Sequence, residues 1–394
     1  MTTVDQLAAL RTPAGEAALT AAATLVGDDP LTAATALRAQ GVAPDLAAAA
    51  LTQATLRTRA VAKFGPDAHR MFLTRPGLEQ ATRAVVAARR AARLAAAGVR
   101  HLADLGCGIG ADTIACAQAG LQVTAVEADP ATAAVAAANL AALGLTDRAT
   151  VHAGRAEQAD LSDVDAVFCD PARRTRTGRR LFDPDTFSPS WDFLLTLPHR
   201  VPRTVLKLAP GLDHARIPTG AEAAWVSVDG DLVEATLWHG PLAEVPRRAT
   251  VLRDGQVTEL TGSGRVAAPT GPVRGYLYDP DPAVIRAGLV AEFAATMSGH
   301  LADPTIAYVY ADTAVATPLA RCLAVEQVLP FSLKRLRATL RTAGIGHVEI
   351  MKRGSAVDVE HLRRQLRLSG TGAATLVLTR VAGSPTVLVC QRLP

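Results

Sequence analysis

A carboxylate and a run of cations come together at the end of an apolar stretch, in residues 168–180, which read FCDPARRTRTGRR. Asp170-Pro171 closes the apolar run, and five arginines follow within eight positions. A carboxylate accepts hydrogen bonds from N–H groups, and a guanidinium binds phosphate or stacks on a base. The segment is therefore a candidate substrate site. The alternatives are a strand-ending turn at Asp170-Pro171 and a solvated loop that carries the arginines.

A second group of chemically suggestive residues is the glycine-rich stretch 104–110, which reads DLGCGIG. It follows an apolar run and precedes a helical pattern, and its glycines allow a tight turn and a close approach to a ligand. Glu127 ends the next apolar run, where a carboxylate can accept hydrogen bonds from ribose hydroxyls. The pattern predicts a nucleotide-type site.

The glycines alone leave the nucleotide open, because Gly106-x-Gly108-x-x-Ala111 also fits the dinucleotide fingerprint. Asp104, two residues before the first glycine, favours S-adenosylmethionine. Its carboxylate can face the ammonium group of that cofactor, whereas a pyrophosphate in the same place would be repelled.

The elements that would position these residues follow from the alternation after residue 100. Short apolar runs alternate with helical patterns, which indicates βαβ units and a parallel, doubly wound sheet. Asp229-Gly230 between two apolar runs predicts a hairpin, so the sheet should end in an antiparallel strand. The expected strands are 101–105, 121–127, 149–153, 165–170 and 204–210, and the expected helices are 110–120, 130–144 and 189–197.

The DLGCGIG stretch, followed by VEAD at 126–129, resembles motifs I and II of the class I S-adenosylmethionine-dependent methyltransferases. The resemblance covers about residues 100–240. It implies a Rossmann-like class I methyltransferase core with S-adenosyl-L-methionine as cofactor. Asp104 would take the methionine end and Glu127 the ribose. The loop itself would be shaped by Gly106, Gly108 and Gly110.

The same resemblance assigns the adenine contacts to the residues after the third strand, Ala156 and Glu157. Many family members have Asp where this chain has Arg155. Members that methylate exocyclic amines of bases often carry [DN]-P-P-[aromatic] after the fourth strand. Here the second proline and the aromatic are replaced, which weakens the match. Asp170 and Pro171 are the catalytic candidates, and the substrate-binding candidates are Arg173, Arg174 and Trp191.

The segment 63–83, upstream of the core, is expected to act as a lid or substrate guide, with its apolar members packed in the core: Phe64, Met71, Phe72 and Leu78. Residues 78–97 are expected to form one helix. The division that we predict is an N-terminal helical region (1–97), the methyltransferase core (98–242), a connecting α/β region (243–324) and a small α+β domain (325–394).

The last of these parts resembles the THUMP-like domain that accompanies a group of bacterial methyltransferases, and this resemblance implies an RNA partner. From residue 331 onward there are 11 Lys and Arg against 3 Asp and Glu, a balance of +8 on a chain whose net charge is +4. Such a balance suits a polyanion. Phosphate contacts are expected from Lys334, Arg335, Arg337, Arg341, Lys352, Arg353, Arg363, Arg364 and Arg367.

Several classes of protein are disfavoured by composition. The sequence contains no apolar run of about 18 residues free of charges, so no membrane span is predicted. The N-terminus lacks the pattern of a signal peptide. Five scattered cysteines suggest a reducing, cytoplasmic setting and no zinc cluster. No metal is expected. Cys169 precedes Asp170 on a strand and should point into the core, so it is not expected to be a nucleophile.

The function predicted from the sequence is a cytoplasmic methyltransferase that acts on RNA (tRNA or rRNA) at a base exocyclic amine. One alternative is the same chemistry on a small metabolite or a protein. Another is a non-catalytic RNA-binding factor that retains the fold. The oligomeric state stays open.

Overall fold

The computed structural model describes residues 4–173 and 187–393. The chain divides into two compact units, one of Met1–Leu208 with Leu237–Ala243, the other of Ala209–Thr236 with Glu244–Pro394. No helix among the described residues is long and apolar enough to cross a bilayer.

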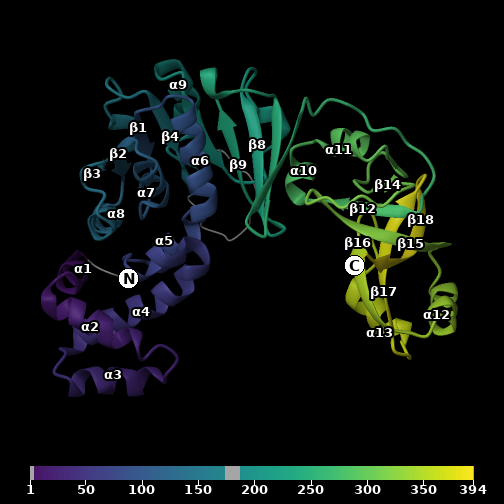
Figure 1. Cartoon of the computed structure of the whole chain (residues 1–394), viewed down its shortest axis with the longest axis horizontal. Helices are drawn as coiled ribbons and strands as arrows, with labels where there is room; N and C mark the ends of the chain where they lie inside the picture. Colours follow the sequence, from purple (N-terminus) through teal and green to yellow (C-terminus); the bar gives the residue numbers. More distant parts are fainter. Residues whose placement is uncertain (1–3, 174–186, 394) are drawn as a thin grey trace. The chain divides into compact units, whose positions relative to one another are not determined.

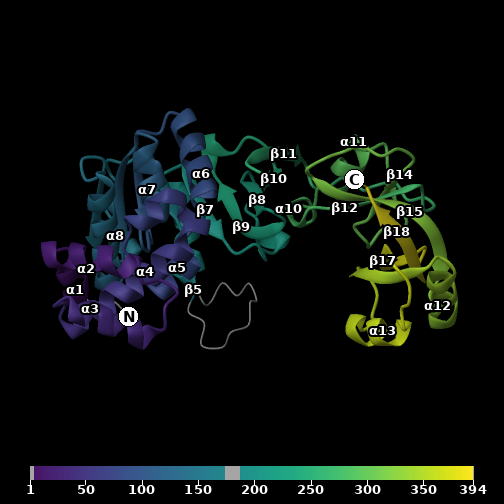
Figure 2. The same cartoon turned by 60° about the horizontal axis from the view of Figure 1, so that its bottom comes forward.

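The first unit begins with helices, as predicted for residues 1–97 (Figures 1 and 2). Proline at the first turn opens α2, α3 and α4, where its missing N–H costs nothing. The bounds are α1 (Val4–Leu10), α2 (Pro13–Ala23), α3 (Pro30–Ala39), α4 (Pro44–Phe64), α5 (Arg75–Gln80) and α6 (Ala84–Ala96).

The single helix expected over 78–97 is wrong, because α5 ends at Gln80 and α6 starts at Ala84. The backbone is extended at Ala81 and Arg83, on either side of Thr82. This bend lets the Thr82 hydroxyl donate to the buried carboxylate of Asp112 (2.6 Å). A tertiary hydrogen bond thus overrides helix propensity.

Five parallel strands form the centre of the first unit, in the order β3-β2-β1-β4-β7. Because β4 pairs with β1, with Cys169 opposite Leu105, the loops after these two strands meet at one edge of the sheet. The strands are β1 (His101–Leu105), β2 (Gln122–Glu127), β3 (Ala149–Ala153), β4 (Ala166–Cys169) and β7 (Thr204–Leu208), with helices α7 (Ala111–Gln118), α8 (Pro130–Leu143) and α9 (Trp191–Arg200).

The expected hairpin is confirmed, but it does not end the sheet, because two further strands extend the same sheet beyond it. In the second unit, β8 (Glu222–Val228) and β9 (Asp231–Trp238) are neighbours joined by Asp229-Gly230. Both turn residues have positive φ (52° and 87°), as a type I′ turn requires. The last residues of β9, Leu237 and Trp238, belong to the first unit.

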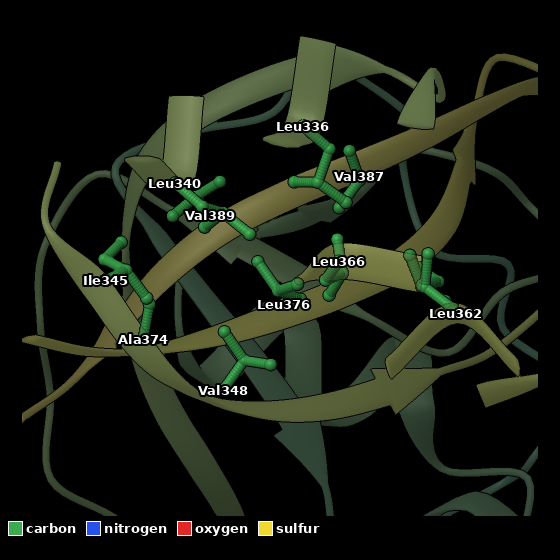
Figure 3. Packing of buried hydrophobic residues seen from close by; sticks show 11 residues of the cluster. Leu336, Leu340, Ile345, Val348, Leu362, Leu366, Ala374, Leu376, Val387 and Val389 are labelled. Carbon is green, nitrogen blue, oxygen red and sulfur yellow. The ribbon is translucent and has the colours of Figure 1, made fainter. Parts of the chain in front are cut away.

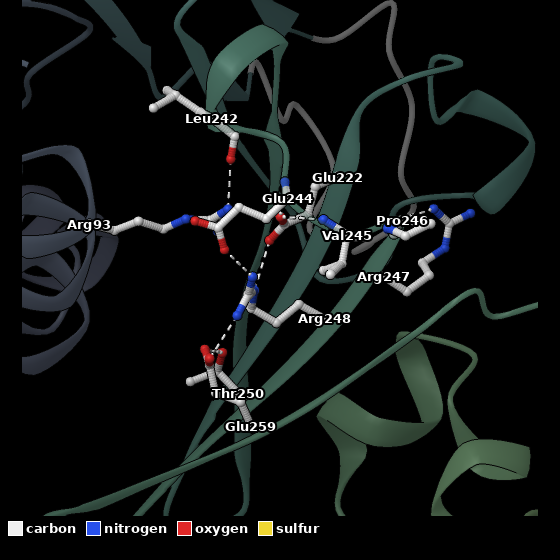
Figure 4. Close-up of polar contacts among 10 residues, drawn as sticks. All are labelled: Arg93, Glu222, Leu242, Glu244, Val245, Pro246, Arg247, Arg248, Thr250 and Glu259. Carbon is white, nitrogen blue, oxygen red and sulfur yellow. Dashed lines mark hydrogen bonds and ion pairs between the residues drawn. The ribbon is translucent and has the colours of Figure 1, made fainter. Parts of the chain in front are cut away.

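The hairpin continues into β10 (Arg247–Arg253), parallel to β8, and β11 (Gln256–Gly262), antiparallel to β10. Arg248 on β10 binds three carboxylates at 2.7–2.8 Å, those of Glu222, Glu244 and Glu259 (Figure 4). Glu222 is fully buried, so its charge depends on this partner.

A second sheet, of seven strands, lies in the rest of the second unit in the order β13-β14-β12-β15-β18-β17-β16. Its strands are β12 (Tyr276–Pro280), β13 (His300–Leu301), β14 (Val309–Ala311), β15 (Ala320–Pro330), β16 (Ile345–Lys352), β17 (Gly372–Val381) and β18 (Ser384–Arg392). Helices α10 (Pro282–Arg286) and α11 (Val290–Thr296) precede β13. The expected boundary at residue 325 falls inside β15, and the division into four parts stays a prediction.

Helices α12 (Leu333–Thr342) and α13 (Val359–Leu366) pack on this second sheet. Leu336 and Leu340 of α12 and Leu362 and Leu366 of α13 meet Leu376 of β17 in one apolar cluster (Figure 3). The i, i+4 spacing of each leucine pair places both side chains on one helix face. The α+β character expected of the C-terminal domain is confirmed.

Candidate active site

The glycine-rich loop joins β1 to α7 and packs against the loop after β4. Gly106 has φ 86°, and its N–H donates to the carbonyl of Val126 (2.8 Å). A Cβ on Gly106 would lie 2.8 Å from the backbone oxygen of Asp170. Gly108 and Gly110 also have positive φ, so side chains at these positions would be strained. The backbone conformation requires all three glycines.

Asp104, at the carboxyl end of β1, has the properties of a binding carboxylate. It is buried, and Thr113 Oγ1 donates to its Oδ2. Its Oδ1 is buried without a hydrogen-bond partner in residues 4–173 and 187–393. Burial raises the pKa of Asp104 to about 7, and the negative charge of Asp112 adds to the rise. A buried acceptor without a partner fits the ammonium group of S-adenosylmethionine.

Glu127 ends β2 and holds the glycine-rich loop itself. Its Oε2 accepts from the N–H of Gly108 (2.9 Å), and its Oε1 accepts from the N–H of Asp129 (3.0 Å). A carboxylate has about four lone-pair sites, so both oxygens can still accept from ribose hydroxyls. The sequence predicted the contact of Glu127 with the ribose, which stays a prediction. It did not predict that Glu127 holds the glycine-rich loop.

The two residues expected at the adenine lie just after β3. Ala156 is buried at the start of a short 3-10 turn. Glu157 is exposed, and its Oε1 accepts from the Arg155 guanidinium (2.9 Å). The arginine that departs from the family pattern is therefore the partner of Glu157. The contacts of Ala156 and Glu157 with the adenine stay a prediction.

Asp170 follows β4 and lies beside the glycine-rich loop, where its N–H donates to the Leu105 carbonyl (3.2 Å). Its Oδ2 is 2.5 Å from Nζ of Lys207 on β7. The Asp170 side chain is 33% exposed and the Lys207 side chain 12%. Pro171 is buried. The structure thus puts Asp170 at the cofactor end of the sheet, paired with a cation.

Lys207 is the residue that the sequence reasoning missed. A signal was present, because a single lysine interrupts the apolar strand TVLKL. A charge in a buried strand needs a partner, and the strand beside β7 ends next to Asp170.

The substrate-binding candidates are only partly described. The backbone of Arg173 lies in β5 (Ala172–Arg173), which pairs with β6 (Phe187–Ser188). The Arg173 side chain and all of Arg174 lie outside the described residues. The ring of Trp191, at the start of α9, is 6.3 Å from that of Phe187. The β5–β6 pairing therefore brings Trp191 toward the Asp-Pro loop.

Two buried amides hold the upstream segment, and one of them also bonds the glycine-rich loop. Gln53 of α4 exchanges two hydrogen bonds with the backbone of Leu73 (2.7 and 2.9 Å). Asn139 of α8 does the same with Phe72 and also donates to the Ile109 carbonyl (2.9 Å). Residues 72 and 73 are thus fixed between α4 and the loop, and the role of this segment as a lid or substrate guide stays a prediction.

Core packing of the apolar residues in that segment is confirmed, since all four are buried: Phe64, Met71, Phe72 and Leu78. A Cβ on Gly77 would lie 2.4 Å from Ile109 Cγ2, so α5 packs directly on the glycine-rich loop. Lys63 Nζ donates to the carbonyls of Leu78 (2.6 Å) and Glu79 (3.0 Å) near the end of α5.

Thiol and metal chemistry find no support among the described residues. Cys169 is fully buried, and burial followed by the charge of Asp170 raises its thiol pKa well above the usual range. A thiol in that state does not supply a thiolate. Within the part of the chain that the structure describes, no three His, Cys, Asp or Glu residues are grouped to hold a metal ion.

Comparisons with known proteins agree with this geometry. The methyltransferase domain family matches residues 102–177, the THUMP domain-like family residues 320–392, and a domain family of unknown function residues 3–60. An uncharacterized S-adenosylmethionine-dependent methyltransferase of Mycobacterium tuberculosis is 35% identical over 360 residues, which cover 85% of this chain and 94% of that protein.

Two further matches are informative. A 23S rRNA (uracil(1939)-C(5))-methyltransferase of Acidithiobacillus ferrooxidans is 35% identical over 102 residues, 24% of this chain and 23% of that protein. A crystal structure of a candidate methyltransferase from Porphyromonas gingivalis W83 has a TM-score of 0.75 at 21% identity and covers 96% of this chain and 99% of that one. The second match shows a shared fold.

Proposed function

Because the chain belongs to the S-adenosylmethionine-dependent methyltransferases, we propose that it methylates RNA at an exocyclic amine of a base. Its cofactor, S-adenosyl-L-methionine, follows from that membership, and its class I core is supported by the strand order β3-β2-β1-β4-β7, with β9 between β7 and β8. The proposal concerns the acceptor and the roles of the individual residues. The observation that carries it is the place of Asp170, at the carboxyl end of β4 and against Gly106.

Three groups of this chain would hold the cofactor. The Oδ1 of Asp104 would accept from the ammonium group, and Glu127 would accept from the ribose hydroxyls. The N-terminal end of α7 and the glycine-rich loop would carry the methionine part, with Ala156 and Glu157 beside the adenine. Asn139 and Gln53 keep the loop and the upstream segment in a fixed relation before the cofactor binds, which limits the ordering cost of binding.

When bound, the cofactor supplies a methyl group on a sulfonium, which the amine takes as the carbon–sulfur bond breaks and its electron pair stays on sulfur. Asp170 would accept a hydrogen bond from the amine N–H. This hydrogen bond localises the nitrogen lone pair toward the methyl group. After the transfer, Asp170 would take the surplus proton from the methylated nitrogen and pass it to water. Positioning and electrostatics of this kind account for much of enzymatic rate enhancement.

Support for an RNA acceptor comes from the second unit. The THUMP domain-like match covers residues 320–392. Arg337 and Arg353 are partly engaged within this unit, Arg337 by the Gln365 carbonyl and Arg353 by Asp279. Lys352 and Arg363 are exposed, and each also donates to a backbone carbonyl, that of Val357 and that of Val348. The other expected phosphate contacts are exposed as well, and these are Lys334, Arg335, Arg341, Arg364 and Arg367.

The rRNA methyltransferase among the relatives is named for a uracil carbon. Methylation at that carbon needs a thiolate nucleophile, and the buried Cys169 does not provide one. We therefore place the acceptor at a base amine. We further propose a cytoplasmic location, consistent with five cysteines that are all free.

The acceptor class can be tested by offering the protein bulk tRNA, ribosomal RNA and a metabolite extract with methyl-labelled S-adenosylmethionine. We expect label in one of the RNA pools. Label only in the extract or in protein would replace RNA with a small or polypeptide acceptor. Cofactor binding without transfer to any pool would favour a non-catalytic role.

A further inference from the structure

The first turn of α7 carries a buried threonine whose hydroxyl bonds a carboxylate of another element. Thr113 is fully buried, and its Oγ1 donates to Oδ2 of Asp104 on β1 (2.5 Å). The other oxygen of that carboxylate, Oδ1, is buried and has no hydrogen-bond partner in the described ranges 4–173 and 187–393. The proposed function uses Oδ1 for the cofactor but does not say what fixes its direction.

This hydrogen bond differs from the usual one of a threonine in a helix. A helical threonine often donates to the carbonyl four residues earlier, and five threonines of α2, α3 and α4 do so: Thr20, Thr35, Thr52, Thr55 and Thr58. For Thr113 that carbonyl belongs to Ile109, and it accepts from Nδ2 of Asn139 on α8 (2.9 Å). The Thr113 hydroxyl is directed instead toward Asp104.

We propose that Thr113 is a positioning residue of the cofactor site: its hydroxyl holds Oδ2 of Asp104, so that Oδ1 is presented to the ammonium group of S-adenosylmethionine. β-Branching restricts χ1 of a threonine, so the hydroxyl has little freedom to turn. Gly110, with φ 90° at the N-cap, starts α7 directly after the glycine-rich loop. The loop that carries the cofactor therefore also places this hydroxyl. The inference rests on the proposed function, because it takes the contact between Asp104 and the ammonium as given.

Thr113 also opposes the effects that favour the protonated form of Asp104. Burial, followed by the charge of Asp112, raises the pKa of Asp104 to about 7, and the charge of Asp170 acts in the same direction. The hydrogen bond from Thr113 lowers this pKa, and so, less strongly, does the charge of Arg90, which is paired with Asp112. Loss of the Thr113 hydroxyl should therefore raise the pKa of Asp104 and leave less of it ionised near neutral pH. Burial also raises the pKa of three neighbouring thiols, so they add no charge: Cys107, Cys116 and Cys169.

The test compares two ligands that differ at the amino-acid end. S-adenosylhomocysteine carries the ammonium, whereas methylthioadenosine keeps the adenosine and the sulfur but lacks the amino-acid part. The variant Thr113→Val keeps the β-branched shape and removes the hydroxyl. In titration calorimetry it should bind S-adenosylhomocysteine about tenfold more weakly at about pH 7.5, the lower end of the range for a hydrogen bond to a charged group. Its affinity for methylthioadenosine should stay within a few-fold of the wild type.

A pH profile and a rescue separate the positioning role from a general loss of structure. The affinity of the wild type for S-adenosylhomocysteine should level off as pH rises past about 7, where most of Asp104 is ionised. In Thr113→Val the affinity should still be rising at about pH 7.5, because the carboxylate then titrates at a higher pH. Thr113→Ser keeps the hydroxyl and should restore the wild-type affinity to within a few-fold.

Thr204→Val is the matched control. Thr204 is also fully buried, and its hydroxyl donates to the Val201 carbonyl (2.6 Å) at the start of β7, away from the carboxyl ends of the strands. This variant loses the same group from a buried threonine and should bind both ligands as the wild type does. If Thr113→Val does not fold, Thr113→Ala also removes the hydroxyl and carries the same prediction.

The outcomes separate this inference from the proposed function. Wild-type affinity for S-adenosylhomocysteine in Thr113→Val, or equal losses for both ligands, would overturn the positioning role and leave the contact of Asp104 with the ammonium in place. If the wild-type protein binds S-adenosylhomocysteine no more tightly than methylthioadenosine, that contact is wrong and this inference fails with it. The methyl acceptor is tested by labelling of RNA, and a failure there would leave these affinities unchanged.

Discussion

Cofactor affinity should depend on pH through Asp104, because only the ionised carboxylate can pair with an ammonium. With a pKa of about 7, about one tenth of Asp104 is ionised at pH 6 and about three quarters at pH 7.5. The apparent dissociation constant is the intrinsic one divided by the competent fraction. Partial loss of the ammonium proton near pH 7.5 reduces the gain, since α-amino groups titrate at about 7.7–8.0. The net expectation is an apparent Kd that is about five- to sixfold tighter at pH 7.5 than at pH 6.

The stability of the ligand-free protein should change with pH in the opposite direction to its affinity for the cofactor. The pKa of Asp104 is raised in the folded state, so the folded protein takes up a proton that the unfolded chain binds only near pH 4. The stability contributed by that proton is fully present below pH 4, approximately, and is lost as pH rises through about 7. As pH rises through about 7, the melting temperature of the free protein should therefore decline. Over the same pH range, the rise in melting temperature caused by the cofactor should become larger.

The assay is titration calorimetry with S-adenosylmethionine between pH 6 and 7.5, on the wild type and on Asp104→Asn. The variant should bind about ten- to a hundredfold more weakly at pH 7.5, because it lacks the charge-assisted hydrogen bond, and its affinity should vary little with pH. Asp160→Asn is the matched control, because that carboxylate is exposed and has a lowered pKa. Pairing with the ammonium is refuted if the wild-type affinity is flat, or if Asp104→Asn keeps the wild-type slope.

Four further variants test the rest of the account. Asp170→Ala should abolish methyl transfer in a labelling assay and leave cofactor affinity within a few-fold; full activity would remove its acceptor role. Gly106→Ala should weaken cofactor binding and lower the melting temperature, because its Cβ would meet the Asp170 carbonyl at 2.8 Å; wild-type values would contradict this close approach. Leu336→Ala should lower the free energy of unfolding by about 2–5 kcal/mol in denaturant titration; a decrease under about 1 kcal/mol would contradict the packing in Figure 3. Lys334→Gln with Arg335→Gln should flatten the salt dependence of RNA binding by about 0.7–0.9 for each phosphate that the variant no longer neutralises, whereas an unchanged slope would place the RNA elsewhere.

Local patterns were enough to predict much of the site. Gly106, Gly108 and Gly110 mark a loop that only glycine can form, and Asp229-Gly230 marks a turn that requires positive φ at both residues. Asp170 could be placed because a doubly wound sheet sets the fourth strand beside the first. In each of these cases, a few neighbouring residues carry the whole physical constraint.

The features that the sequence did not predict depend on contacts between distant residues. Gln53 and Leu73 are 20 positions apart, and Asn139 and Phe72 are 67 apart. An amide in an alanine-rich helix gives no sign of the backbone that it will bind. The helix break at Thr82 has a similar origin, since it depends on the buried Asp112. Lys207 pairs with Asp170 across 37 positions for the same reason.

The measurement that tests the central claim most directly is mass spectrometry of nucleosides from RNA that this protein has methylated with labelled S-adenosylmethionine. The account predicts that the label lies on an exocyclic amine of a base. Label on a pyrimidine carbon or a ribose oxygen, or unlabelled RNA from a folded protein that binds the cofactor, would contradict it.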